Sequence, residues 1–154
     1  MHSVIMQVGE RPIREDCWIT ESDYLDNGFV GSVADYVRTY SKEERAEFLK
    51  NIGDFKIFRL DGDCIVIKNR ESYFKEKYEK FSNAVSDLAD VSYGTFSNAD
   101  NHVYSKIFEL TSSYNDKYDM YIRDDGGTQT LDHWMRKVKN GDRFYIGGVL
   151  DYHF

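Results

Sequence analysis

The chain has 154 residues, with 20 Lys and Arg against 27 Asp and Glu, two Cys and one Pro. A chain of this length buries about 68–70% of the surface that its unfolded form exposes, so it can fold without a metal or a disulfide. Aromatic residues make up 16% of it, which argues against intrinsic disorder. The longest apolar or glycine run, 144–150, is much shorter than the roughly 20 residues of a membrane helix. We therefore expect no membrane span.

The formal net charge is −7, and it is unevenly spread. Residues 1–35 carry seven acids and two bases, whereas residues 42–80 carry nine acids and ten bases. No segment forms a basic stripe, which disfavours direct nucleic-acid binding, because affinity for phosphates depends on Lys and Arg. Cys17 and Cys64 lie among apolar neighbours and have no metal-ligand spacing. Two reduced thiols, and no basic start to Met1–Val8 of the kind a signal peptide has, favour a cytoplasmic location.

Three elements are predicted before position 52. Weak alternation in Met1–Val8 favours a strand. Apolar residues then recur at helical spacing and predict a helix near 30–40. These residues are Val30, Val33, Ala34 and Val37. The sequence Ser41-Lys-Glu-Glu44 matches a capping box and predicts a helix over 42–51.

A hairpin and a long helix follow. Asp61-Gly62 between two β-prone runs predicts a hairpin over 55–68, with Leu60 opposite Asp63. Residues 71–90 have one apolar stripe and Glu-to-Lys pairs at i,i+4, which predicts a helix with this stripe in the core. The stripe consists of Phe74, Tyr78, Phe81, Val85 and Leu88.

The last third of the chain reads as strands around one helix. Residues 92–101 are rich in Ser, Asn and Gly and are predicted as a loop. Residues 103–111 fit a strand or a helix, and we assign a strand. A strand near 117–123 should turn Tyr118, Met120 and Ile122 inward. A helix near 129–139 precedes a strand at 143–152, in which Gly147-Gly148 indicates a bulge or a close backbone approach.

Hairpins separated by grouped helices predict the α+β class with a mostly antiparallel sheet. We expect a single compact domain over 1–154. The loop at 92–101 is the one place where a subdivision would fit.

Motifs for catalysis are weak. Gly126-Gly127 precedes a helix, but Asp124 and Asp125 stand before it and would repel an anion. These two acids could join His133 and His153 in a metal- or carboxylate-dependent hydrolase, although no metal-binding motif supports this. We therefore predict no catalytic residue, no metal and no cofactor, and keep the hydrolase as an alternative.

Two stretches combine acids with rings, which suits docking onto a basic groove. The first consists of Glu15, Asp16, Trp18, Glu21, Asp23, Tyr24 and Asp26. The second consists of Tyr114, Asp116, Tyr118, Asp119, Tyr121, Asp124 and Asp125. From it we select Asp119, Tyr121, Asp124 and Asp125 as binding residues, with Tyr121 expected on the exposed face of its strand. Both predict a protein partner with a basic groove.

In type, a small acidic, tyrosine-rich chain without a catalytic motif looks like the accessory and inhibitor proteins of phages and mobile elements, some of which mimic nucleic-acid charge. This resemblance rests on no residue-by-residue motif. It implies an interaction or inhibitor protein that docks an acidic-aromatic surface on a larger, nucleic-acid-handling protein. A self-associating structural protein is a further alternative, and the sequence leaves the oligomeric state open.

Overall fold

The computed structural model describes residues 1–98 and 102–154. Contacts between residues group the chain into two units. The sheet unit comprises Met1–Arg70 and Lys117–Phe154, and the helical unit comprises Glu71–Asp116. The boundaries between the units therefore fall outside the 92–101 stretch where the sequence suggested a subdivision.

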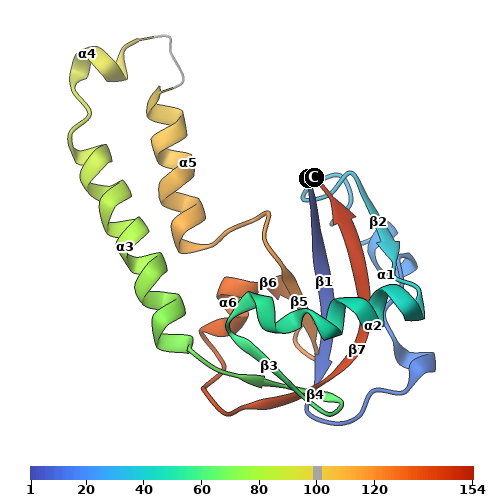
Figure 1. Ribbon diagram of the computed structural model, residues 1–154. Coiled ribbons are helices and arrows are strands. Elements are labelled where there is room, and N and C mark those ends of the chain that lie inside the picture. Colours follow the sequence, from blue (N-terminus) through green and yellow to red (C-terminus); the bar gives the residue numbers. More distant parts are fainter. Residues whose placement is uncertain (99–101) are drawn as a thin grey trace. The chain divides into compact units, whose positions relative to one another are not determined.

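The sheet unit is built on two long central strands, β1 (His2–Gly9) and β7 (Arg143–His153). They pair antiparallel from His2 opposite His153 to Gly9 opposite Tyr145 (Figure 1). The register shifts between Met6 and Val8. This pairing joins segments from the two ends of the sequence, and every other strand is added to it.

Five shorter strands complete a seven-stranded sheet in the order β3-β4-β7-β1-β5-β6, with β2 also on β7. Their bounds are β2 (Tyr36–Thr39), β3 (Phe58–Asp61), β4 (Cys64–Ile67), β5 (Tyr121–Asp124) and β6 (Gly127–Thr130). Only the β1–β5 pair is parallel among these ladders in the described residues. The α+β class and the mostly antiparallel sheet are confirmed.

The hairpin predicted over 55–68 is present, but its register differs from the prediction. Leu60 pairs with Ile65 and not with Asp63, and Asp61 pairs with Cys64. The two turn residues are thus Gly62 and Asp63. Gly62 has a φ of +61°, a conformation that glycine adopts without steric cost, so glycine sits first in the turn.

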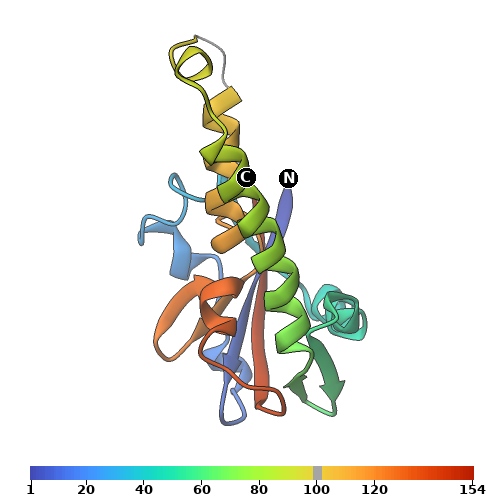
Figure 2. The same ribbon diagram turned by 90° about the vertical axis from the view of Figure 1, so that its left-hand side faces the viewer.

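Both faces of the sheet are covered, with α2 (Lys42–Lys50) against one face and α1 (Ser22–Leu25) against the other (Figure 2). On the α1 side, buried apolar residues from β1, β5, β7 and the 19–37 segment form one cluster. Its members are Ile5, Ile19, Tyr24, Phe29, Ala34, Val37, Tyr121, Leu150 and Tyr152. Alternation along the strands puts Met6 and Ile122 on the other face. Both are fully buried.

A chain of ring contacts runs along this second face. Phe48 of α2 meets Phe55, and Phe55 of the 3₁₀ helix η2 (Ile52–Phe55) meets Phe58. Phe58 then meets Trp134 of α6 (Leu131–Met135) with ring centroids 6.4 Å apart, and Trp134 meets Phe144 at 5.0 Å. The high aromatic content thus supplies much of this core.

The predicted capping box at the start of α2 is present. Ser41 Oγ accepts a hydrogen bond from the Glu44 amide at 3.1 Å, and Glu44 accepts one from the Ser41 amide at 2.8 Å. Arg38 Nη1 also donates to the Glu44 carboxylate at 2.9 Å. This donation is the main reason why the pKa of Glu44 falls to about 2, and the Ser41 amide adds to it.

The helix predicted near 30–40 is wrong. The backbone bends at Gly31, whose φ is +92°, and residues 36–39 form β2, which pairs with the second half of β7. The open edge of β7 accounts for this, since Val37 joins the core as a strand residue opposite Tyr152. Pairing with a strand therefore overrides the helical spacing.

Two other elements are shorter than predicted. The helix expected at 129–139 is α6, which starts only at Leu131 because Gly127–Thr130 pairs with β5. Thr130 ends that strand and caps the helix by accepting a hydrogen bond from the His133 amide. The strand expected at 117–123 is β5, which begins at Tyr121.

The helical unit contains α3, α4 and α5, and α3 and α5 lie side by side and antiparallel in both views (Figures 1 and 2). Their bounds are α3 (Arg70–Ala89), α4 (Tyr93–Phe96) and α5 (His102–Tyr114). The helix predicted over 71–90 is therefore confirmed. The strand predicted near 103–111 is wrong, because these residues belong to α5. Its physical basis is a half-buried row at spacings of three and four residues, typical of two paired helices: Val103, Lys106, Leu110 and Ser113.

The loop predicted at 92–101 contains α4. Ser92 caps α4 by accepting a hydrogen bond from the Thr95 amide at 3.1 Å. The last part of the predicted loop, 99–101, lies outside the described residues.

The Gly147-Gly148 pair is a site of close backbone approach, as predicted. A Cβ at Gly148 would lie 2.6 Å from the Ile19 carbonyl oxygen. The Gly148 amide donates to Gln7 Oε1 at 2.9 Å, next to the register shift in β1. Gln7 also accepts from the Ile19 amide, so the absence of a side chain lets three segments meet here.

We predict that Gly148→Ala lowers the free energy of unfolding by about 1–3 kcal/mol, because overpacking forces backbone shifts. Gly53→Ala is the control, since a Cβ there meets nothing within 4 Å. Urea unfolding followed by circular dichroism measures both. Equal stabilities for the two variants would contradict the assigned contact.

A second prediction concerns Glu44. Its pKa is lowered from 4.5 to about 2 in the folded protein, so its contribution to stability is present above pH 4.5 and is lost as the pH falls through 2. The stability difference between wild type and Glu44→Gln should therefore shrink between these two pH values in chemical unfolding experiments. Glu43→Gln, which removes the same charge from the same helical turn, should not reproduce this loss.

Candidate interaction surfaces

The acids of the first predicted patch lie on the surface, and most of them have partners within the sheet unit. Glu15 pairs with Lys42 Nζ at 2.6 Å, and Asp16 pairs with Arg14. Asp23 accepts a hydrogen bond from the Thr20 amide at 2.7 Å. These carboxylates therefore have local partners, and the bases next to Glu15 and Asp16 reduce the negative potential that these two acids present.

The two remaining acids of this patch differ from each other. Glu21 accepts a hydrogen bond from the Thr39 amide at 2.9 Å, which is the main reason why its pKa is lowered. Asp26 is exposed just after α1. Glu21 thus ties the start of α1 to β2.

The rings of the first patch are only partly accessible. Trp18 is half-buried, with the Arg45 guanidinium 4.3 Å from its ring centroid, and its Nε1 donates to the Ile13 carbonyl oxygen. Tyr24 is buried in the core cluster, where its hydroxyl lies 2.8 Å from Thr128 Oγ1. Burial is the main reason why the pKa of Tyr24 is raised. The ring that was expected to dock is therefore a core residue.

The tyrosine selected from the second predicted surface, Tyr121, is also unavailable for docking. Tyr121 was expected on an exposed face, but it is buried edge-on against Phe29 with centroids 5.0 Å apart. Its hydroxyl donates to the Lys117 carbonyl oxygen at 2.9 Å. The expectation was wrong because β5 lies next to β1 under the α1-side cluster, which covers the face that alternation assigned to solvent. Asp119 stays half-buried beside it.

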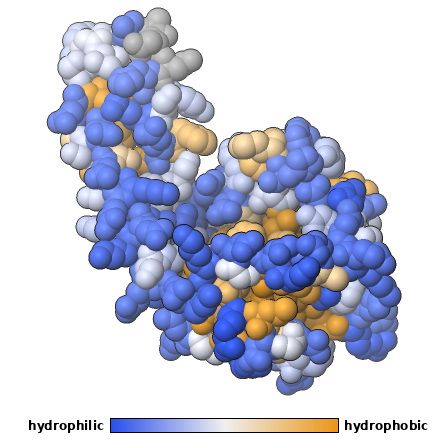
Figure 3. All heavy atoms as spheres, viewed as in Figure 1, coloured by the Kyte–Doolittle hydropathy of each residue, from blue (hydrophilic) through white to orange (hydrophobic). Residues whose placement is uncertain are grey.

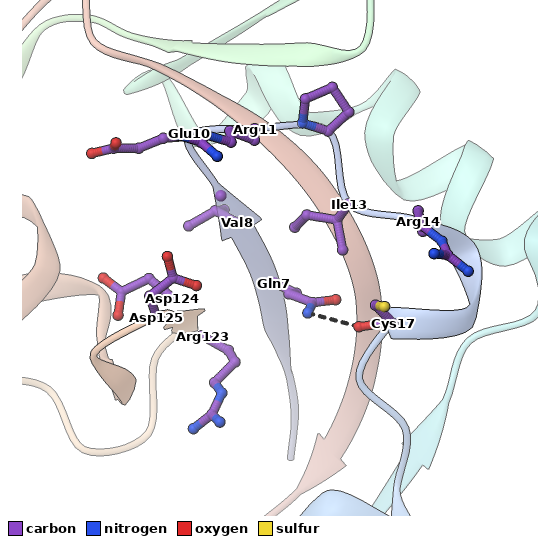
Figure 4. Close-up of a pocket in the computed structure, with 12 residues that line it drawn as sticks. Gln7, Val8, Glu10, Arg11, Ile13, Arg14, Cys17, Arg123, Asp124 and Asp125 are labelled. Atoms are coloured by element: carbon purple, nitrogen blue, oxygen red, sulfur yellow. Dashed lines mark hydrogen bonds between the residues drawn. The ribbon is translucent and has the colours of Figure 1, made fainter.

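Asp124 and Asp125 line an open cleft of about 680 Å³ at the ends of β1 and β5 (Figure 4). The figure shows the two acids on one side of β1, and Arg14 and Cys17 on the other. Charged side chains of both signs line this cleft in equal numbers: Arg11, Arg14, Arg123, Glu10, Asp124 and Asp125. Asp124 accepts from Gln129 Nε2 at 2.8 Å and from the Gly126 amide at 2.9 Å. The mixed charge gives this cleft no preference for a basic partner.

The four residues of the hydrolase alternative do not converge. His153 pairs with Asp35 at 3.2 Å and stacks on Tyr36, at the end of the sheet where β1 starts. The β1–β5 register puts Arg123 opposite Gln7, so Asp124 and Asp125 lie toward the other end of β1. His133 is exposed on α6. Among residues 1–98 and 102–154, no group of three or more His, Cys, Asp or Glu is placed to hold a metal ion.

The exposed rings of this chain are concentrated in the helical unit. Tyr93, Phe96 and Tyr104 are 85%, 71% and 71% exposed. Within the described part of this unit, Ala84 is the only residue classed as buried. Space-filling atoms show apolar patches among polar ones along these helices (Figure 3). Exposed apolar side chains that gather on one surface commonly mark a binding site.

A hollow of about 430 Å³ lies beside these rings. Its lining is apolar except for one serine: Leu88, Val91, Ser92, Tyr93, Phe96, Val103 and Ile107. Asp87 and Asp90 are exposed on the same helix end as Leu88. We call Tyr93, Phe96 and Tyr104, with this hollow and the two acids, the tip surface.

Sequence reasoning missed the tip surface because it assigned 92–101 to a loop and 103–111 to a strand. Two signals could have found it. Ser92 three residues before Thr95 is a helix cap, and the row from Val103 to Ser113 has helical spacing. Once α3 and α5 are recognised as two antiparallel helices, Tyr93 and Phe96 fall in the segment that connects them.

No protein-family model, curated protein or solved structure matches this chain. In the part of the chain that the structure describes, no helix has the length and apolar character to cross a membrane.

The different burial of the rings leads to a prediction. Tyr24→Ala should lower the free energy of unfolding by about 3–5 kcal/mol, as expected for a large buried ring. Tyr24→Phe, which loses only the hydrogen bond to Thr128, should cost about 1 kcal/mol. Tyr93→Ala is the matched exposed control and should change stability by less than about 0.5 kcal/mol. Chemical unfolding of the three variants decides this, and a stable Tyr24→Ala variant would return Tyr24 to the candidates for docking.

Proposed function

We propose that this protein is an interaction protein of the accessory or inhibitor type, and that it docks its tip surface onto a basic site of a larger protein. The observation that carries the proposal is the exposure of Tyr93, Phe96 and Tyr104 beside an apolar hollow. Aromatic side chains that become buried on association commonly supply most of the binding free energy. They also immobilise few torsions, so they lose little entropy on binding.

Charge supports a basic partner. Residues 81–115 contain four acids and one base, and Asp87 and Asp90 are exposed near the hollow. A partner that inserts an apolar side chain into the hollow can bring Lys or Arg next to these carboxylates. The net charge of −7 on the whole chain would speed the encounter with such a partner.

Nucleic-acid-handling proteins are the class of partner that this charge fits best, because their binding surfaces are rich in Lys and Arg. The location that fits is the cytoplasm, since Cys17 and Cys64 are both free thiols. The acids at 15–26 would then add long-range attraction. The contact itself would be made by the helical unit.

The test is affinity capture from an extract of the source organism, followed by mass spectrometry. Wild type is compared with the double variant Tyr93→Ala/Phe96→Ala and with Tyr36→Ala, which removes an exposed ring of the sheet unit. We expect a partner that wild type and Tyr36→Ala retain and that the double variant loses. Far-UV circular dichroism checks that the helices persist.

The captured partner is then measured by calorimetry at increasing salt. Affinity should fall as salt rises, and Asp87→Asn/Asp90→Asn should reduce this salt dependence, because screening acts on these charges. Equal capture of the partner by wild type, Tyr36→Ala and the double variant Tyr93→Ala/Phe96→Ala would contradict the role of the tip surface. Affinity that is independent of salt would contradict the basic partner.

A further inference from the structure

One face of the α3–α5 hairpin carries no charge along most of its length. Successive residues of a helix are about 100° apart, so each position can be assigned to one side of the α3–α5 contact. Ten residues from the two helices fall on the same side of this contact. We call these residues the uncharged face: Phe74, Tyr78, Phe81, Ser82, Val85, Ala89, Val103, Ile107, Thr111 and Tyr114.

The contacts within the hairpin support this grouping. The Phe81 and Tyr114 rings meet with centroids 6.2 Å apart. Toward the C-terminal end of α3, Leu88 and Ile107 line the same hollow, as do Val91 and Val103. The two helices therefore run antiparallel in a register that puts Phe81 beside Tyr114 and Val91 beside Val103.

Much of the uncharged face is open to solvent. Tyr78, Val85, Ile107 and Tyr114 are 69%, 44%, 46% and 58% exposed. The sequence predicted Tyr78 and Val85 as core residues of a single stripe. The structure instead places Phe81, Ala84 and Leu88 toward the inside and leaves those two beside the contact with α5. α3 thus has a second apolar row, which α5 does not cover.

Charged residues of the two helices fall on the other sides at the same spacing. They are Lys75, Glu76, Lys77, Glu79, Lys80, Asp87, Asp90, Lys106 and Glu109. Glu71, in the first turn of α3, is the exception and falls at one end of the uncharged face. A partner that presents Lys or Arg to the uncharged face would leave these cations desolvated and without a counterion, which is costly. The occupant of this face should therefore itself be uncharged and apolar.

We propose that the uncharged face binds the uncharged face of a second copy of this chain about a two-fold axis, so that the two hairpins form a four-helix assembly. A two-fold contact brings the same patch from both copies together, so any charge near the axis would face its own kind. A face without charge avoids that repulsion even though each chain carries −7 overall. The proposal does not depend on the tip surface, with which it shares only Val103 and Ile107.

The size of the face is compatible with a dimer. Each helix is about 10 Å across, and at 1.5 Å per residue α3 is about 30 Å long and α5 about 20 Å long. This is on the order of 500 Å² of flat area per copy, of the same order as the roughly 800 Å² of accessible surface per partner in standard interfaces. The helical unit otherwise buries little of its own surface, so pairing would supply packing that it lacks.

Val85 marks the centre of the two-helix part of the face. It lies between the Phe81–Tyr114 contact and the hollow that Val91 and Val103 line. A two-fold axis through this centre puts Val85 of one copy next to Val85 of the other. Opposite charges at this position can therefore pair across the axis, whereas identical charges repel.

The experiment measures mass by light scattering at several protein concentrations. Wild type should have twice the mass of one chain at about 100 µM and dissociate on dilution. Val85→Glu and Val85→Lys should each weaken association at least about tenfold, because each places like charges together at the centre. An equimolar mixture of the two variants should recover the dimer, which a role of Val85 in folding alone would not produce.

Asn83→Glu is the control, since it adds the same charge to an exposed position of α3 outside the uncharged face. It should remain dimeric, and circular dichroism should show equal helix content in all variants. A wild type that is monomeric at every concentration would overturn the proposal. A dimer that tolerates Val85→Glu, or a mixture that fails to associate, would overturn it too. The affinity capture described for the tip surface is unaffected by any of these results.

Discussion

The antiparallel pairing of β1 with β7 is the constraint on which the sheet unit depends. β7 pairs with β1 along one edge, and along its other edge it pairs with β4 and then with β2. It can serve two partners on that edge because it is 11 residues long. Near its middle, Gly148 lets the backbone at Ile19 approach closely and Gly147 leaves room for the Gln7 side chain, at the point where β1 shifts register. The helices that cover the two faces, α1 and α2, lie against the sheet that is built on this pair.

Local patterns predicted the elements whose structure is set by neighbouring residues. The capping box at Ser41, the Asp61-Gly62 signal and the charged pairs of α3 all act over a few positions. Each predicted an element that is present, although the hairpin turn lies one residue later than expected. Several of the errors arose where a distant partner decided the outcome. Residues 36–39 became a strand because β7 offered an open edge, and α6 was shortened because β5 paired with the residues before it.

The same distinction explains the candidate site. An acidic-aromatic surface was predicted from composition, and the acids are on the surface because charge alone places them there. Which rings are exposed depends on packing between segments, which the sequence does not reveal. Tyr24 and Tyr121 were drawn into a core with Phe29 and Tyr152, whereas Tyr93 and Tyr104 flank a helix connection that lacks such a core. The docking residues therefore had to be sought in a different unit.

The helical unit is an insertion between strands that belong to one sheet. Its own contacts join residues close in sequence, whereas β1 and β7 join His2 to His153. Closing a sheet over such a separation is slow, because the chain loses much conformational freedom before the first ladder forms. Local helices form far faster. The α3–α5 hairpin of the newly made chain should therefore acquire structure before β1 and β7 have paired.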